Sequence, residues 1–281
     1  MHIFKHISDL KKALLPFREK GAHIGFVPTM GALHKGHLSL IHECVSTDDV
    51  SVASIYVNPT QFNNREDLQR YPRDLGRDCE MLRNAHCDFV FVPSDAEMYP
   101  EPDTRVFDFG TMGMIMEGIY RPGHFNGVAQ IVTRLFDIVE PGRAYFGQKD
   151  FQQLAIIRKL VSNLNYTIDI VACPIIREAD GLAMSSRNML LSEKERKSAP
   201  LIYQTLKQVR KQFMARSVTE LEEFVIQNFN KSVDLKLEYF QIVDNETLQP
   251  VNTIRPDIPV TACIAVYAGK IRLIDNIELI S

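Results

Sequence analysis

The stretch Ile24-Gly25-Phe26-Val27-Pro28-Thr29-Met30-Gly31-Ala32-Leu33-His34-Lys35-Gly36-His37-Leu38-Ser39-Leu40-Ile41 predicts a strand, a tight turn and a helix. The run from Ile24 to Val27 is apolar, as a buried strand requires, and we expect Pro28 to stop it. Small residues follow, and apolar side chains then recur at the helical spacing of Leu38, Ile41 and Val45. We interpret the rest of the chain as organised around this unit.

Two histidines, His34 and His37, lie at the mouth of the predicted helix. The unpaired N–H groups and partial positive charge of a helix N-terminus favour anions, and Gly31 and Gly36 leave room for a polyanion to approach the backbone. The stretch therefore predicts a phosphate cradle with neutral or protonatable donors, although a purely structural turn or a zinc site also fits it. Zinc would require a third ligand, and the sequence contains neither a Cys-x-x-Cys nor a His-Glu-x-x-His motif.

The composition is ordinary for a globular protein and excludes several function classes. The chain has 281 residues, of which 45% are hydrophobic and 24% charged, with a net charge of −3 that gives no indication of nucleic-acid binding. We find neither an apolar run of membrane-spanning length nor a signal-peptide pattern. The five cysteines are odd in number and lack paired spacing, so we expect reduced thiols in a cytoplasmic protein.

Predicted strands and helices alternate through the first part of the chain. We expect buried strands at residues 50–57, 88–92, 144–146 and 168–172, and an edge strand at 104–109. We expect helices at 8–20 with Ser8 as N-cap and Pro16 as a kink, at 66–85 in two pieces broken at Tyr71-Pro72 and Gly76, at 128–136 and at 151–161. The alternation predicts an α/β fold: a Rossmann-like, mostly parallel sheet with helices on both faces over residues 1–176.

The pattern changes after Arg177. Capping boxes at Ser192 with Glu195 and at Ser217 with Glu220 predict helix starts, and Pro200 either kinks the first helix or begins a second piece. We expect strands at 235–243, 260–268 and 271–275, the last two joined by a tight turn at Gly269-Lys270. Helices followed by an antiparallel sheet predict a small α+β C-terminal domain, a lid over residues 177–281.

Three polar turns lie between predicted strands and helices of the first domain. Asn58-Pro59-Thr60-Gln61-Phe62 lies at the carboxyl end of strand 50–57, so Gln61 is either a ligand contact or part of a plain Asn-Pro turn. Gly147-Gln148-Lys149-Asp150 joins strand 144–146 to the next helix, and Lys149 supplies a point charge suited to phosphate. Arg121-Pro122-Gly123-His124-Phe125-Asn126-Gly127 opens the helix at 128–136, as a lid or as a capped loop.

Together these motifs resemble the pantothenate synthetase family, which lies within the nucleotidyltransferase and class I synthetase superfamily that shares the His-x-Gly-His unit. The resemblance covers nearly the whole chain and implies ATP-dependent condensation of (R)-pantoate with β-alanine to pantothenate, AMP and pyrophosphate, by a homodimer. The motifs stand in the family's order: Pro-Thr-Met-Gly-Ala-Leu-His-Lys-Gly-His, Val-Asn-Pro-Thr-Gln-Phe, Arg-Pro-Gly-His-Phe, Phe-Gly-Gln-Lys-Asp-Phe-Gln-Gln, Met-Ser-Ser-Arg-Asn and Arg-Leu-Ile-Asp-Asn.

The resemblance also implies roles for individual residues. Gln61 and Gln153 match pantoate contacts, with Gln61 also facing β-alanine, and His37 matches a proton donor. Gln148 stands where many members carry Glu, so we infer that no catalytic charge is required there. The residues that match ATP contacts are Met30, Gly31, Ala32, Leu33, His34, Lys35, Gly36, His37, Gly147, Gln148, Lys149, Asp150, Ile176, Met184, Ser185, Ser186 and Arg187.

The chemistry of these residue types fits the implied reaction. A carboxylate becomes a good acyl donor once it is an acyl-adenylate, and negative charge then develops on the α-phosphate and the departing pyrophosphate. Preorganised donors stabilise such charge, and we expect His34, His37, Lys149, Ser185, Ser186 and Arg187 to supply them. Mg²⁺ is expected on the β- and γ-phosphates. The sequence does not identify its protein ligand, for which Asp74 and Asp78 are weak candidates.

Other functions share part of this pattern. An adenylyltransferase that leaves AMP on its product has the same His-x-Gly-His unit, and a nucleotide-binding regulator without catalysis could retain the fold. Intact His34, His37, Lys149 and Arg187 argue against the regulator. No basic anticodon-binding region supports a tRNA synthetase. We therefore expect small-molecule partners, namely ATP, pantoate and β-alanine, and neither nucleic acid nor a membrane.

Overall fold

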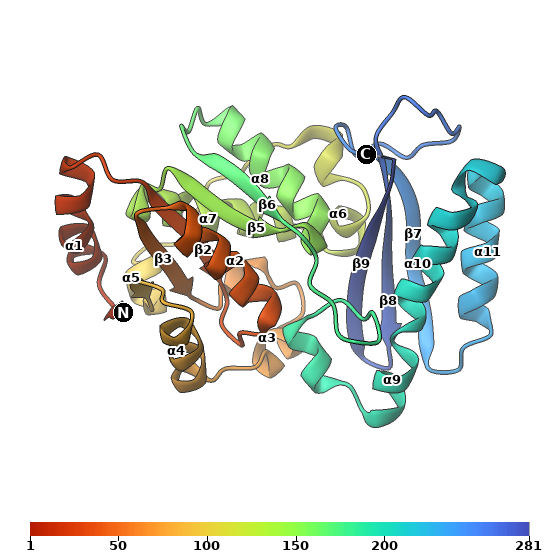
Figure 1. Ribbon diagram of the computed structural model, residues 1–281, viewed down its shortest axis with the longest axis horizontal. Coiled ribbons are helices and arrows are strands. Elements are labelled where there is room, and N and C mark those ends of the chain that lie inside the picture. The colour runs from red at the N-terminus through yellow and green to blue at the C-terminus, as the bar shows by residue number, and fades with distance from the viewer. Residues whose placement is uncertain (281) are drawn as a thin grey trace.

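The computed structural model describes residues 1–280, which form two β-sheets (Figure 1). In the six-stranded sheet every neighbouring pair is parallel, and the order is β1 (His2–Phe4), β4 (Phe89–Phe91), β3 (Val50–Ile55), β2 (Ile24–Thr29), β5 (Arg143–Gly147) and β6 (Asp169–Cys173). The three-stranded sheet is antiparallel, with the order β7 (Leu235–Asp244), β8 (Val260–Ala268) and β9 (Ile271–Ile280). The predicted fold class is confirmed.

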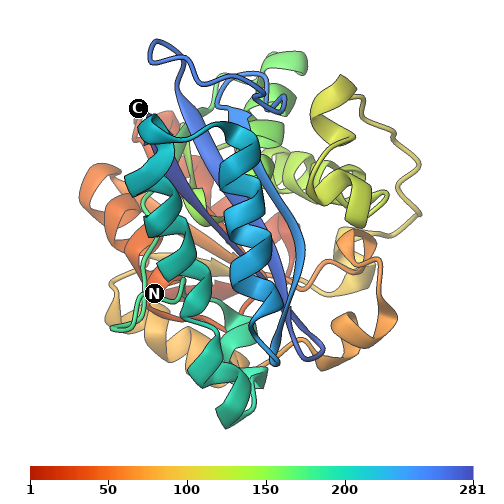
Figure 2. The same ribbon diagram turned by 90° about the vertical axis from the view of Figure 1, so that its right-hand side faces the viewer.

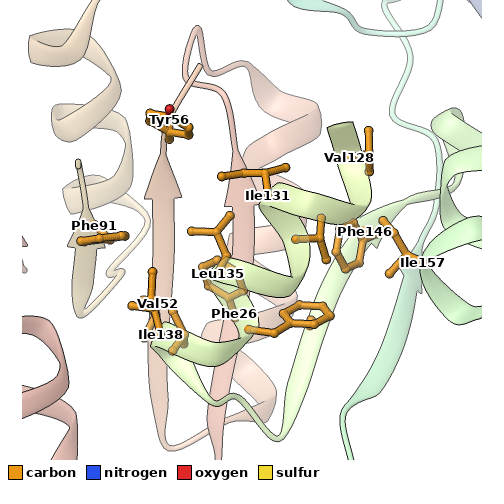
Figure 3. Close-up of a cluster of buried hydrophobic side chains, with 14 of the residues drawn as sticks. Phe26, Val52, Tyr56, Phe91, Val128, Ile131, Leu135, Ile138, Phe146 and Ile157 are labelled. Atoms are coloured by element: carbon orange, nitrogen blue, oxygen red, sulfur yellow. The ribbon is translucent and has the colours of Figure 1, made fainter. Parts of the chain in front are cut away.

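Helices cover both faces of the parallel sheet. Alternate residues of β2 point to opposite faces: Phe26 packs against Phe136 with ring centroids 6.5 Å apart, and Val27 belongs to a separate cluster with Ile41. Figure 3 shows the first cluster, in which side chains of a helix rest on the strands. The first cluster involves α1 (Ile7–Glu19), α7 (His124–Val139) and α8 (Phe151–Asn163), and the second involves α2 (Lys35–Thr47) and α4 (Leu75–Asn84).

Short helical segments fill the connections. In the N-terminal part these are η1 (Pro59–Gln61), α3 (Arg65–Arg70), α5 (Asp95–Met98), η2 (Gly110–Gly113), α6 (Glu117–Tyr120) and η3 (Gln148–Asp150). In the C-terminal part the helices are η4 (Ser186–Leu190), α9 (Glu193–Ser198), α10 (Leu201–Gln212), η5 (Phe213–Ala215) and α11 (Val218–Asn230).

The C-terminal part has its own hydrophobic core. Helices α10 and α11 lie against the antiparallel sheet, as Figure 2 shows from that side. Both predicted capping boxes are present, at Ser192 with Glu195 and at Ser217 with Glu220. Pro200 precedes α10 as its N-cap, so it begins a second helical piece. The division of the chain at residue 177 stays a prediction.

The predicted edge strand at 104–109 is wrong. No strand forms there, because side chains of α7 satisfy its backbone: Asn126 accepts a hydrogen bond from the Phe107 N–H at 2.9 Å, and Gln130 donates to the Arg105 carbonyl at 2.9 Å. The edges of the sheet are instead β6 and β1, and β1 is a three-residue strand paired with β4 that the sequence did not predict. Its brevity left too few residues for a periodicity to show.

Three local predictions also need correction. Pro28 lies inside β2 rather than ending it; β5 pairs with β2 only at Gly25 and Phe26, so the missing N–H of Pro28 costs no hydrogen bond to β5. Ser8 is inside α1, whose first N–H, on Ile7, is held by the Glu97 carboxylate at 2.8 Å. Gly76 lies inside α4, which begins after Asp74 caps it.

The strand order determines where a ligand can bind. From β2, the sheet grows through β3 in one direction and through β5 in the other, so the order reverses between β2 and β5. In open α/β sheets the crevice at the carboxyl ends of such strands is the ligand site. The segments that follow β2 and β5 are the two turns that carry His34 and Lys149.

Candidate active site

The turn after β2 is held in a strained form by a buried carboxylate. Gly31 and Ala32 have φ of 77° and 49°, the second of which is unfavourable for a residue with a side chain. The Asp78 carboxylate accepts hydrogen bonds from the N–H groups of Ala32 at 2.8 Å and Leu33 at 2.7 Å. Burial raises the pKa of Asp78, and these two donors oppose the increase. Asp78 therefore shapes the turn that presents the histidines.

The two histidines lie at the start of α2, as predicted. His34 is the N-cap, and its Nδ1 accepts a hydrogen bond from the Gly36 N–H at 3.1 Å. The two imidazole rings lie in contact and tilted to one another, with centroids 4.1 Å apart and an angle of 32° between their planes. The Nδ1 atom of His37 is buried and has no hydrogen-bond partner within residues 1–280. Both rings line the cavity described below.

The electrostatics of the site keep both rings neutral. Burial, with a smaller contribution from the charge of Lys149, lowers the pKa of His34 to about 4. Burial, His34 and Lys149 together lower the pKa of His37 well below its usual value. Because neutral His34 accepts a hydrogen bond at Nδ1, its proton is on Nε2. The sequence left neutral and protonated donors open, and the lowered pKa values of His34 and His37 favour the neutral form of both rings.

The turn after β5 carries Lys149 to the same place. It forms η3, and Lys149 lies 3.7 Å from the Asp150 carboxylate. Asn276 of β9 donates from Nδ2 to the carbonyls of both Gln148 and Lys149, at 2.9 and 3.0 Å. The C-terminal sheet therefore fixes the backbone of the lysine-bearing turn.

The segment Met184–Arg187 closes a third side of the site. The Ser186 hydroxyl donates to the Ala32 carbonyl at 2.9 Å, which attaches this segment to the turn after β2. The Arg187 guanidinium contacts the Asp67 carboxylate through Nε at 3.2 Å and Nη2 at 2.7 Å, and lies 5.7 Å from the ring centre of Tyr71. Arg187 is thus held by α3 and the residues that follow it.

The predicted substrate glutamines face the same cavity. The Asn58 side chain donates to Gln61 Oε1 at 3.2 Å, and Gln61 Nε2 lies 3.3 Å from the Met30 sulfur. His124 Nδ1 lies 2.9 Å from the Gln61 carbonyl, and Gln153 reaches the cavity from the first turn of α8. Gln61 is therefore fixed by both its side chain and its backbone.

One cavity of about 220 Å³ joins most of the predicted residues. Five residues that the resemblance also assigned to ATP do not line this cavity. Three of them are buried in the turn after β2, namely Gly31, Ala32 and Leu33, and the other two, Lys35 and Gln148, are exposed. The predicted residues that line it are Met30, His34, Gly36, His37, Gln61, Gly147, Lys149, Asp150, Gln153, Ile176, Met184, Ser185, Ser186 and Arg187.

The structure offers no ready-made metal centre. Within residues 1–280 no three His, Cys, Asp or Glu side chains are grouped to hold a metal ion. Asp74 caps α4, accepting from the Arg77 N–H at 3.0 Å, and both oxygens of Asp78 are occupied by backbone donors. Among the same residues, no helix has both the length and the apolar character needed to cross a bilayer.

The sequence did not identify the residues that hold the predicted site residues in place. Asn58, Asp67, Tyr71 and Asn276 each contact a predicted site residue, yet none was singled out for that role. Asn58 and Asn276 do stand within motifs that resemble the family's, which is the signal that could have found them. Asp67 had no such signal, because its partner lies 120 residues away.

The switch point of the Rossmann-like sheet brings together a histidine-capped helix, a lysine-bearing turn and two amide side chains. This combination defines a nucleotide-using α/β enzyme. The family model described as pantoate-beta-alanine ligase matches residues 2–278. The chain therefore belongs to the pantoate–β-alanine ligase family.

Individual relatives agree with this assignment. The chain is 51% identical to the pantothenate synthetase of Bacteroides thetaiotaomicron over 278 residues, which is 99% of each chain. Among solved structures, pantothenate synthetase from Thermus thermophilus is 41% identical with a TM-score of 0.93, covering 100% of both chains. The Francisella tularensis ligase, solved with beta-gamma ATP and β-alanine, is 36% identical with a TM-score of 0.84, covering 99% of this chain and 98% of that one.

Proposed function

We propose that the protein joins (R)-pantoate to β-alanine in two steps: ATP first converts pantoate to a bound pantoyl-adenylate with release of pyrophosphate, and the amine of β-alanine then displaces AMP. The observation that carries this proposal is the single cavity in which His34, His37, Lys149 and Arg187 face Gln61 and Gln153. Phosphate-binding groups and amide groups for a hydroxy-acid meet there, as adenylation of a carboxylate requires.

The first step places negative charge where the donors are. An oxygen of the pantoate carboxylate attacks the α-phosphorus, and the bond from that phosphorus to the pyrophosphate oxygen breaks. His34 can donate from Nε2 without carrying a charge, because its pKa is low. Lys149 and Arg187 supply the fixed positive charge. Preorganised donors of this kind are each worth about 2.7–4 kcal/mol in the transition state.

His37 suits a role that begins with nucleotide binding. Its buried Nδ1 lacks a partner within residues 1–280, so its ring has no hydrogen bond to lose there when a ligand arrives. A triphosphate beside it brings negative charge, which raises the pKa of a histidine. We therefore assign His37 as a hydrogen-bond donor to the bound nucleotide, with a proton-donor character that grows as ATP binds.

The glutamines suit pantoate better than an arginine would. Gln61 is preorganised by Asn58 and by the contact between His124 and its carbonyl. An amide can orient the hydroxyls and the carboxylate of pantoate without the strong ion pair of a guanidinium, which would reduce the nucleophilicity of the carboxylate. Gln153 approaches from α8 and can bind the other end of the hydroxy-acid.

Among residues 1–280, neither the cysteines nor Ser186 is arranged as a covalent nucleophile. All five cysteines are buried free thiols, and burial raises the pKa of Cys44, Cys87, Cys173 and Cys263. The Ser186 hydroxyl is committed to the Ala32 carbonyl. The activated species is therefore a bound adenylate rather than an acyl-enzyme.

Magnesium enters the proposal only as an ion carried by ATP. Mg²⁺ prefers to keep several waters and to bind through substrate phosphates with one or two carboxylates, and the absence of a three-ligand group within residues 1–280 fits that preference. Asp150 lines the cavity beside Lys149 and is the accessible carboxylate there. On the family resemblance alone, we also propose a cytoplasmic homodimer, which light scattering of the purified protein tests.

The decisive experiment separates the two steps. With ATP, pantoate and Mg²⁺ but no β-alanine, labelled pyrophosphate should exchange into ATP. Adding β-alanine should then yield pantothenate and free AMP by mass spectrometry. Exchange that appears only with β-alanine would refute the adenylate, and AMP that stays attached to the product would favour an adenylyltransferase instead.

A further inference from the structure

Within the turn Arg121–Gly127, the proposed chemistry gives a role to His124, which contacts the Gln61 carbonyl, but none to Arg121. Arg121 follows α6, which lies beside the antiparallel sheet (Figure 1). It lies where two cavities next to the active site meet. The smaller is shared with His124, Lys149 and Gln153, and the larger, of about 510 Å³, is shared with Arg187 and opens toward Lys270.

The guanidinium of Arg121 has more N–H donors than it has hydrogen-bond partners. Within residues 1–280 its guanidinium makes one hydrogen bond, a long contact of 3.5 Å to Glu117 Oε2. The Glu117 carboxylate is already bound more closely by others: Arg272 donates at 2.8 and 2.7 Å, and the Tyr239 hydroxyl donates at 2.9 Å. The Glu117 carboxylate is therefore paired mainly with Arg272, and the guanidinium of Arg121 remains incompletely paired.

Apart from the exposed Lys270, the other cations that line these cavities each lie beside a carboxylate. Arg187 makes a two-point contact with Asp67, and Arg272 also contacts Glu238 at 2.5 Å. Lys149 lies beside Asp150 on the nucleotide side. Burial lowers the pKa of Arg121; Glu117 opposes this, and Arg187 and Arg272 lower the pKa further. A carboxylate bound at the junction of the cavities would give the Arg121 guanidinium the close partner that Glu117 does not supply.

The position of Arg121 relates it to the substrate glutamines. His124, three residues further on, begins α7 and contacts the Gln61 carbonyl at 2.9 Å. Arg121 and Gln153 line the same small cavity. An anion bound by Arg121 would therefore lie close to the acyl group that Gln61 and Gln153 are proposed to hold.

We propose that Arg121 binds the carboxylate of the amino-acid substrate, so that the amine at the other end faces the activated acyl group. This inference rests on the proposed function. Arginine binds a carboxylate through two parallel N–H donors, which fixes orientation as well as position. Such a contact selects amino acids over simple amines of the same length, because an uncharged end leaves the guanidinium unpaired.

The test compares the complete reaction with its first half. In Arg121→Gln the KM for β-alanine should rise roughly 10- to 100-fold, the scale for losing a hydrogen bond to a charged group, while pantoate-dependent pyrophosphate exchange keeps its wild-type rate. Lys270→Gln is the matched control: Lys270 is an exposed cation of the outer cavity, and its removal should change neither quantity. Arg121→Lys, which keeps the charge, should recover part of the β-alanine affinity.

A second substrate sharpens the result. The wild-type enzyme should prefer β-alanine to 3-aminopropanol, which lacks the carboxylate, and Arg121→Gln should lose most of that preference. An unchanged preference, or a loss of pyrophosphate exchange equal to the loss of overall turnover, would overturn the inference. If the wild-type enzyme shows no exchange yet binds β-alanine in an Arg121-dependent manner by calorimetry, the inference stands and the proposed two-step chemistry fails.

Discussion

Replacing Asp78 by asparagine should destabilise the protein, although it changes a single atom. The carboxylate accepts two backbone N–H bonds, at 2.8 Å from Ala32 and 2.7 Å from Leu33, inside the protein. An asparagine side chain can accept one of these bonds and must turn its own NH₂ group toward the other. One buried N–H is then unsatisfied, which costs about 1–3 kcal/mol, and the remaining bond loses its charge assistance, so the expected loss is about 2–4 kcal/mol.

Urea titration of the purified proteins measures this loss as a difference in the free energy of unfolding. Asp74→Asn is the matched control, because Asp74 is an exposed helix cap and asparagine caps helices as well as aspartate does. That variant should stay within about 0.5 kcal/mol of the wild type.

The same comparison distinguishes structural support from metal binding. If Asp78 were a magnesium ligand, Asp78→Asn would fold with nearly wild-type stability and would need more Mg²⁺ for full activity. A variant that unfolds with the wild-type free energy, or whose activity excess Mg²⁺ restores, would refute the reasoning. We expect instead that Asp78→Asn lowers turnover at every Mg²⁺ concentration, because the turn that presents the histidines loosens.

Three further outcomes are expected. His37→Ala should lower turnover by roughly 10²- to 10³-fold, the scale for one oxyanion donor, with little change in thermal unfolding; near wild-type turnover of the folded variant would contradict the assignment. ATP should increase hydrogen-exchange protection of Met184–Asn188, and unchanged protection would indicate a static loop. Burial would raise the pKa of Glu117, but Arg272 lowers it from 4.5 to about 2, so its contribution, about 3 kcal/mol, should be present above pH 4.5 and lost as the pH falls toward 2. Acid-unfolding curves of Glu117→Gln should lack that part of the pH dependence; a curve parallel to the wild type would count against it.

The parallel sheet could be predicted from sequence because its strands are buried on both faces. Val50–Ile55 is buried at every residue and is mostly apolar in sequence, whereas the segment 104–109 shows an alternation that tertiary contacts override. Asn126 and Gln130 occupy the hydrogen-bonding groups that a neighbouring strand would need. Alternation alone cannot show which partner a backbone will find.

Site residues could be predicted where the signal lies in neighbouring residues of the sequence. They could not be predicted where it depends on contacts between distant segments. His34, His37 and Lys149 each stand at a strand–helix junction, which is a pattern of adjacent residues. The contact between Arg187 and Asp67 and that between Glu117 and Arg272 join segments 120 and 155 residues apart. Only the folded chain places such charges together, and so the incomplete pairing of Arg121 could not be inferred from sequence.

The contact from Asn276 to the turn that carries Lys149 has a consequence for how the enzyme matures. The two hydrogen bonds join residues 128 and 127 positions apart in the chain. During synthesis the ribosome releases the parallel sheet first and β9 much later. Until β9 has folded, the carbonyls of Gln148 and Lys149 lack the two hydrogen bonds from Asn276. The backbone of this turn therefore gains its two contacts from the second sheet only after β9, the strand that bears Asn276, has been made and has folded.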